Sequence, residues 1–109
     1  MTAQRDGFSY WRDDRRYVPM LQRQRTLYAW CLVHYGGDSD EAARTKSEKF
    51  YAYEALDAPC RGLVFHDHAW KWAMLHRFGG GYWNNRPELL KPCDEYWQLE
   101  ESLQSARSS

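Results

Sequence analysis

Branched aliphatic residues are scarce in this chain of 109 residues, which has no isoleucine and three valines. Rings are abundant instead, with eighteen Phe, Trp and Tyr residues, so we expect a core built largely from rings. Trp and Tyr join an apolar body to a polar group and suit surfaces that are dry on one side and wet on the other. With Arg, they are also enriched among interface hot spots. Since Arg outnumbers Lys by eleven to four, the composition favours a protein that binds another protein.

The chain also has no net charge: its formal charge at pH 7 is zero. Disordered chains combine high net charge with few aromatics, so the sequence predicts a folded globular domain of ordinary size. The charges are nevertheless distributed unevenly along the chain. Residues 1–25 hold six Arg against three Asp, whereas residues 88–109 hold two basic against five acidic residues. The two ends either attract one another within the fold or pair between chains.

Long apolar runs and a disulfide framework are also missing. No stretch approaches the ~20 apolar residues of a membrane span, and the first residues lack the apolar core of a secretory signal. Cys31, Cys60 and Cys93 are odd in number and far apart. They predict a reducing, cytoplasmic location.

Apolar periodicity, caps and helix stops predict a mainly α-helical fold, a small domain of about four helices with an aromatic N-terminal arm. We expect helices at residues 19–35, 38–56, 68–78 and 92–104, with one domain over 19–104. Pro19 is a suitable first helical residue, and Asp38 and Asp67 are expected to cap the second and third helices. Residues 1–18 form the arm and residues 105–109 a frayed tail. Residues 63–65 are the one strand candidate.

Several large apolar residues lie off the main stripe of their predicted helices. Trp30 and Val33 do so on the first helix, and we expect them to form the self-association surface of a homodimer. Trp70 and Trp72 face nearly opposite ways, and both faces of that short helix are expected to be core. A protein partner is expected to bind the remaining outward rings and the arm, through Tyr10, Trp11, Arg15, Arg16, Tyr17, Tyr51 and Trp97. For each of these residues the alternative is packing within its own domain.

Catalytic chemistry has little support in the sequence. His66, His68 and His76 are the best metal candidates, but no acidic or Cys ligand lies at standard spacing. We interpret them as surface or interface groups, and expect no metal and no other cofactor. Cys31 and His34 share a helix, but Cys31 lies on the core stripe, where a thiol is usually inert. We therefore expect a protein that is not an enzyme; a small metal-dependent enzyme is the weakest alternative.

Nucleic-acid binding is the stronger alternative, since arginines with interleaved rings in the arm suit phosphates and stacked bases. Against it, the chain has no net positive charge, and Asp6, Asp13 and Asp14 lie among those arginines. No recognition-helix pattern is evident either. An accessory nucleic-acid-binding protein thus remains the second hypothesis.

In size, helical pattern and ring-rich surfaces such as Trp30, Tyr51 and Trp97, the chain resembles the QslA-type quorum-sensing antiactivators of pseudomonads. The resemblance implies a small cytoplasmic protein that binds a LuxR-type transcription factor and prevents its activity without touching DNA. No defining motif matches, so no residue role is carried over. Phage-encoded inhibitors and toxin-immunity proteins share the same general features. The sequence predicts a non-catalytic inhibitor that masks the surface of a protein partner.

Overall fold

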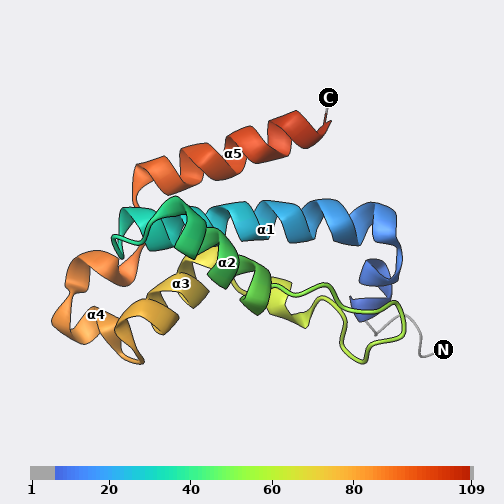
Figure 1. The fold of residues 1–109 in the computed structure, drawn as a ribbon, viewed down its shortest axis with the longest axis horizontal. Helices are drawn as coiled ribbons and strands as arrows, with labels where there is room; N and C mark the ends of the chain where they lie inside the picture. The colour runs from blue at the N-terminus through green and yellow to red at the C-terminus, as the bar shows by residue number, and fades with distance from the viewer. Residues whose placement is uncertain (1–6, 109) are drawn as a thin grey trace.

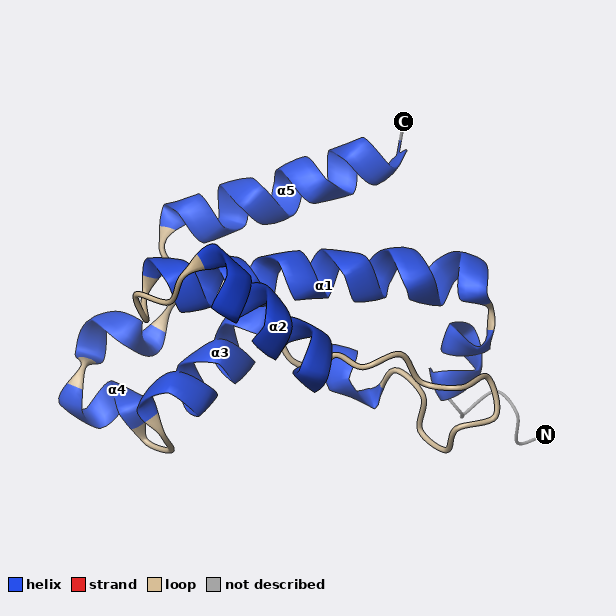
Figure 2. Cartoon of the chain, in the orientation of Figure 1, coloured by secondary structure: helices blue, strands red, loops and turns tan. Residues whose placement is uncertain are grey.

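The computed structural model describes residues 7–108, and the side chains of residues 10–104. Every regular element in this part of the chain is helical (Figure 2), so the predicted mainly α-helical fold with four principal helices is confirmed. Those four are α1 (Asp14–His34), α2 (Asp40–Phe50), α3 (Ala69–Phe78) and α5 (Asp94–Ser108). The shorter elements are the 3-10 helices η2 (Gly7–Arg12), η3 (Leu63–His66) and η4 (Pro87–Leu90), and the single turn α4 (Tyr82–Asn85).

The long helix α1 is the centre of the arrangement (Figure 1). It contacts α2, α3 and α5, and the arm element η2 packs near its beginning. α5 runs antiparallel beside α1, while α2 and α3 cover other sides of it (Figure 1). The molecule measures 46 × 32 × 24 Å. No helix among the described residues has the length and apolar character to cross a membrane.

Helix α1 begins at Asp14, five residues before the predicted start at Pro19. The Asp13 side chain caps it by accepting a hydrogen bond of 2.9 Å from the Arg15 amide, and Asp14 lies near the positive end of the helix dipole. Pro19 consequently lies inside the helix. Its missing N–H costs one hydrogen bond, to the Arg15 carbonyl, in the second turn.

Helix α2 is shorter than predicted at both ends. Ser39, not Asp38, is its N-cap and accepts a hydrogen bond of 3.1 Å from the Ala42 amide. Asp38 instead pairs with Lys46 at 2.9 Å. The helix ends at Phe50 because Tyr51 takes a non-helical conformation, with φ −97° and ψ 57°, and buries its ring.

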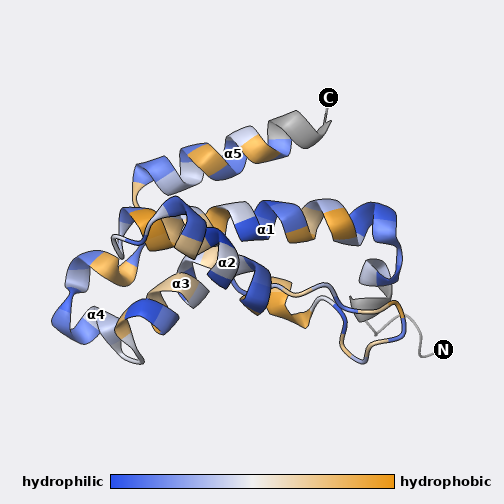
Figure 3. Ribbon diagram, viewed as in Figure 1, coloured by the Kyte–Doolittle hydropathy of each residue, from blue (hydrophilic) through white to orange (hydrophobic). Residues whose placement is uncertain are grey.

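The chain between α2 and α3 also differs from the prediction. The strand candidate at residues 63–65 is the 3-10 helix η3, whose apolar character stands out in Figure 3. No strand exists elsewhere in residues 7–108 to pair with it. His68 precedes α3 as its N-cap, while the predicted cap Asp67 lies 3.6 Å from Lys71 in an ion pair.

Rings build much of the core, as the composition predicts. Phe50 stacks on Tyr28 with ring centroids 5.3 Å apart, and it meets the Trp72 ring at the same distance. The aromatic residues buried at 7% exposure or less are Tyr17, Tyr28, Tyr51, Trp70, Tyr82 and Tyr96. The aliphatic and sulfur-containing side chains of α1 and α3 fill the remaining space around them.

Candidate protein-binding groove

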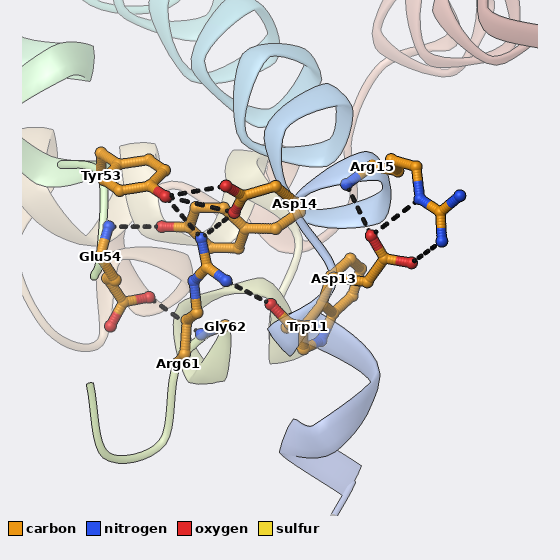
Figure 4. A network of polar contacts seen from close by, with 9 residues as sticks. Trp11, Asp13, Asp14, Arg15, Tyr53, Glu54, Arg61 and Gly62 are labelled. Atoms are coloured by element: carbon orange, nitrogen blue, oxygen red, sulfur yellow. Dashed lines mark hydrogen bonds and ion pairs between the residues drawn. The ribbon is translucent and has the colours of Figure 1, made fainter. Parts of the chain in front are cut away.

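A buried arginine fixes the loop that follows α2 (Figure 4). Arg61 is 1% exposed, and its guanidinium lies 3.8 Å from the ring centroid of Tyr17. It donates hydrogen bonds to the Trp11 carbonyl at 2.9 Å and to the Tyr53 hydroxyl at 3.0 Å, and it forms an ion pair with Asp14. A buried charge is costly without such partners. These contacts therefore hold the loop against the arm and the first turn of α1.

A second set of contacts locks the same loop to the arm (Figure 4). Gly62 has φ +86°, and a Cβ atom built there overlaps the Trp11 indole. Its amide donates to the Glu54 carboxylate at 2.9 Å, and the Glu54 amide donates to the Tyr17 hydroxyl at 2.8 Å. Burial raises the pKa of Tyr17, which keeps that acceptor neutral. The loop thus has a defined shape without regular structure.

The fixed loop forms one wall of an apolar groove of about 350 Å³, called here the Trp72 groove. Its other walls come from the end of α2, from η3 and from α3. Leu63, on η3, is 51% exposed at the groove. The residues that line it are Phe50, Glu54, Pro59, Cys60, Leu63, Val64 and Trp72.

The Trp72 side chain presents apolar surface to this groove. Its ring N–H, the only donor of the indole, is already used in a 3.0 Å hydrogen bond to the Val64 carbonyl. Behind it, His76 meets the Phe50 ring at 4.7 Å and bonds to the Tyr28 hydroxyl at 2.7 Å through Nδ1. Partial burial lowers the pKa of His76, which disfavours its charged form beside the Trp72 ring.

The groove offers apolar contact surface and few polar groups. Glu54 is its one charged residue, and the Glu54 carboxylate already accepts the Gly62 amide. Cys60 lies at the edge with an exposed thiol and φ 58°, an uncommon conformation for a residue with a side chain. A groove with apolar walls and few polar groups suits apolar side chains of a ligand.

The three histidines considered as metal ligands lie in different surroundings. His66 ends η3, His68 packs edge-on against Trp97 at 5.3 Å, and His76 faces Tyr28. Within residues 7–108, no three His, Cys, Asp or Glu side chains gather in a way that could hold a metal ion. The thiol that meets His34 is Cys93, at 3.9 Å from Sγ to Nε2. Cys31, considered for that contact, is fully buried.

The predicted partner-binding residues of the arm are not all exposed. Tyr10 is 51% exposed and lies under the Arg16 guanidinium at 4.5 Å. Arg15 is exposed and pairs with Asp13 at 3.1 Å. Trp11 packs on Phe65 at 5.0 Å, and Tyr17 is 0% exposed. Trp11 and Tyr17 therefore pack within their own domain, which was the alternative for these residues. Trp11 contacts Gly62, and Tyr17 contacts Arg61.

Two expected surfaces on the helices also change. Tyr51 is 1% exposed, in contrast to its predicted outward position, because α2 ends before it. Trp97 is exposed at 38%, as expected. Trp30 and Val33 are partly buried against the core, and the Trp30 ring lies 6.4 Å from Tyr96 of α5. Trp30 and Val33 thus keep part of their surface exposed, and self-association through them stays a prediction.

Sequence reasoning missed Arg61 and the groove residues Leu63 and Val64. Arg61 is one arginine among eleven, and nothing in its neighbours marks it as buried. The run of Leu63, Val64 and Phe65 is a clear apolar signal, but it predicts a strand and not a groove wall formed by two of its residues. Compared with known proteins, the chain matches no family model, no curated protein and no solved structure.

Proposed function

We propose that this protein is a non-catalytic regulator that inhibits a protein partner by masking its surface, and that the Trp72 groove is the main contact. The carrying observation is an apolar groove with a fixed wall and a half-exposed leucine, Leu63, at its edge. Exposed apolar surface that gathers in a groove is typical of sites that bind a ligand or another protein. The partner supplies apolar side chains, as an amphipathic helix does when it occupies a groove.

The resemblance to quorum-sensing antiactivators makes a LuxR-type transcription factor the first partner to test. Tyr53 and Leu56, on the loop that also supplies Glu54, are exposed at 52% and 56% and offer further apolar surface to a partner. Masking requires no chemistry from the regulator, so the inhibition is stoichiometric.

The test compares two matched variants in capture from cells of the source organism. Leu63→Asp places a charge at the groove, whereas Leu90→Asp makes the same change at a 63% exposed site on η4, outside the groove. An anchor at an interface centre is commonly worth about 2 kcal/mol, roughly thirtyfold in affinity. We expect wild type and Leu90→Asp to retain the same protein, and Leu63→Asp to lose it.

The captured partner is then purified, and its activity is measured against increasing amounts of regulator. Inhibition should be complete near one equivalent with wild type and require a large excess with Leu63→Asp. Equal retention by both variants contradicts the role of the groove. Recovery of no protein, or turnover of the partner by catalytic amounts, contradicts the proposed function.

A further inference from the structure

A second depression lies along α1. Most of the residues that line it are polar or charged, in contrast to those of the Trp72 groove. Between α1 and α2 it has a volume of about 400 Å³ and is floored by Gln22, Thr26 and Ala29. A further depression of about 190 Å³ between α1 and Leu103 of α5 shares Gln22 and Thr26 with it. The two depressions therefore adjoin one another along α1, and together they are called here the α1 trough.

Cations predominate in the α1 trough. Arg23, Arg25 and Arg44 line it, against one acid, Glu48. Arg25 is held in place by a 2.9 Å hydrogen bond from Nε to the Tyr51 carbonyl. Neither Arg25 nor Arg44 takes part in the ion pairs among residues 10–104. The Arg25 and Arg44 guanidinium groups are therefore available to a carboxylate of another molecule.

The outer face of α5 has the opposite charge. Asp94, Glu95, Gln98 and Glu101 are exposed on it, and none of these carboxylates takes part in an ion pair of the described residues. A backbone hydrogen bond, aided by the neighbouring Cys93 side chain, lowers the pKa of Glu95. Trp97 adds a 38% exposed ring to the same helix.

We propose that the α1 trough binds the outer face of α5 from a second copy of this chain. The acidic face of one copy neutralises the arginines of the other, which explains why the opposite charges at the two ends of the sequence form no ion pair within the described residues. Charge complementarity of this kind sets partner choice and register. Reciprocal binding closes the pair, because each copy offers one trough and one α5.

The trough suits a mixed-charge helix better than a nucleic-acid backbone. Glu48 lies inside it, and Asp40 and Glu41 lie beside Arg44 at its end. Because carboxylates lie among the arginines, a helix face whose acids are separated by neutral residues such as Gln98 fits this surface better than an unbroken row of phosphates. This interface is separate from the Trp72 groove, and it does not rest on the proposed inhibition of a partner.

The experiment uses two variants with opposite changes. Gln22→Glu with Arg44→Glu makes the trough acidic, and Gln98→Arg with Glu101→Arg makes the α5 face basic. Among residues 10–104, none of these four side chains forms a hydrogen bond or an ion pair. Circular dichroism checks that each variant is folded. Lys91→Glu with Asn85→Asp is the control, with the same net charge change as the acidic trough variant but outside the trough.

Molar mass is measured by light scattering at about 100 µM, because self-association depends on concentration by mass action. We expect a dimer for wild type and control, monomers for each variant alone, and a dimer when the two variants are mixed. Raising the salt from about 0.05 to about 0.5 M should weaken the dimer, since it shortens the screening length. A wild-type monomer overturns the proposal, as does a dimer that both variants retain or a mixture that stays monomeric. The proposal is also overturned if wild type forms no dimer but binds nucleic acid, and the acidic trough variant does not bind it. That result would favour nucleic acid as the ligand of the trough.

Discussion

Arg61 brings a positive charge into a region otherwise formed by rings, and its partners explain why that is tolerated. The face of Tyr17 and the Asp14 carboxylate offset the loss of hydration, since a ring face attracts a cation. Asp14 itself remains 55% exposed, so the pair is buried on one side only. One side chain thereby ties together the arm, the start of α1 and the groove wall.

Replacing Arg61 should therefore destabilise the protein clearly. Arg61→Met keeps much of the side-chain length but leaves the Trp11 carbonyl and the Tyr53 hydroxyl without their donor. Hydrogen bonds to charged groups contribute about 1.5–3 kcal/mol, and we expect a loss of about 2 kcal/mol in the free energy of unfolding, measured in urea. Arg15→Met, at an exposed ion pair, is the control and should change little. Equal effects of the two substitutions would contradict the central role of Arg61.

Gly62 gives a second prediction for the same contact. Gly62→Ala meets both a positive φ and the Trp11 side chain, whereas Gly37→Ala meets a positive φ of +76° in open space. Both variants carry the backbone cost of about 1 kcal/mol, but only the first also forces the indole to move, at about 1–3 kcal/mol more. Urea unfolding of the two proteins measures the difference. Equal stabilities would show that Trp11 does not pack on Gly62.

At the level of elements, the beginning of α2 can be tested at adjacent residues. Ser39→Ala removes the side chain that caps the helix and should cost about 1 kcal/mol. Asp38→Ala removes only the pair with Lys46, whose side chain is 57% exposed, and such pairs contribute roughly 0–1 kcal/mol. Thermal or urea unfolding measures both. A larger loss for Asp38→Ala would favour the capping box expected from the sequence.

The existence of the helices could be predicted, because apolar periodicity and glycine stops are local signals. The residues at which the helices begin and end were harder to predict. Tyr53 and Leu56 continue the apolar pattern of α2, yet the chain leaves the helix at Tyr51 to bury that ring and to make the hydrogen bond from Arg25. Pro19 resembles a helix start, but Asp13 provides a better cap further upstream. Tertiary contacts decide in both cases.

The groove could not be predicted from the sequence, because its walls come from separated segments. Phe50, Leu63 and Trp72 meet only when the loop between α2 and η3 folds back, and that fold depends on Arg61 reaching residues 47 or more positions away. No periodic pattern records such contacts. The sequence did predict that surplus rings exist and that Trp97 is exposed; it could not show which other rings the loop and α5 cover.

At the scale of the whole molecule, α5 is a peripheral helix whose principal contact is with α1. Tyr96 anchors it, fully buried beside Trp30 and accepting a 3.3 Å hydrogen bond from the Trp70 amide. A helix with one principal neighbour can open locally without unfolding of the rest. Cys93 precedes α5, and Cys31 lies in the core. The reactivity of Cys93 therefore reports on local opening of α5, and that of Cys31 on global unfolding.

Thiol labelling of the native protein should accordingly occur in three steps. Cys60 is exposed and should react at once, Cys93 should react at a rate set by local opening of α5, and Cys31 only on global unfolding. Burial raises the pKa of the Cys31 thiol, which suppresses the reactive thiolate, and we expect it to react roughly a thousandfold or more slowly than Cys60. Labelling with a chromogenic disulfide, followed by mass mapping, assigns each step.

Trp30→Ala should accelerate the labelling of Cys93 much more than that of Cys31, because Trp30 supports the Tyr96 anchor. Leu90→Ala, at an exposed site on η4, is the control and should change neither rate. If Cys31 and Cys93 were accelerated equally, α5 and the core would unfold as one unit, and α5 would not be the separately opening helix inferred here.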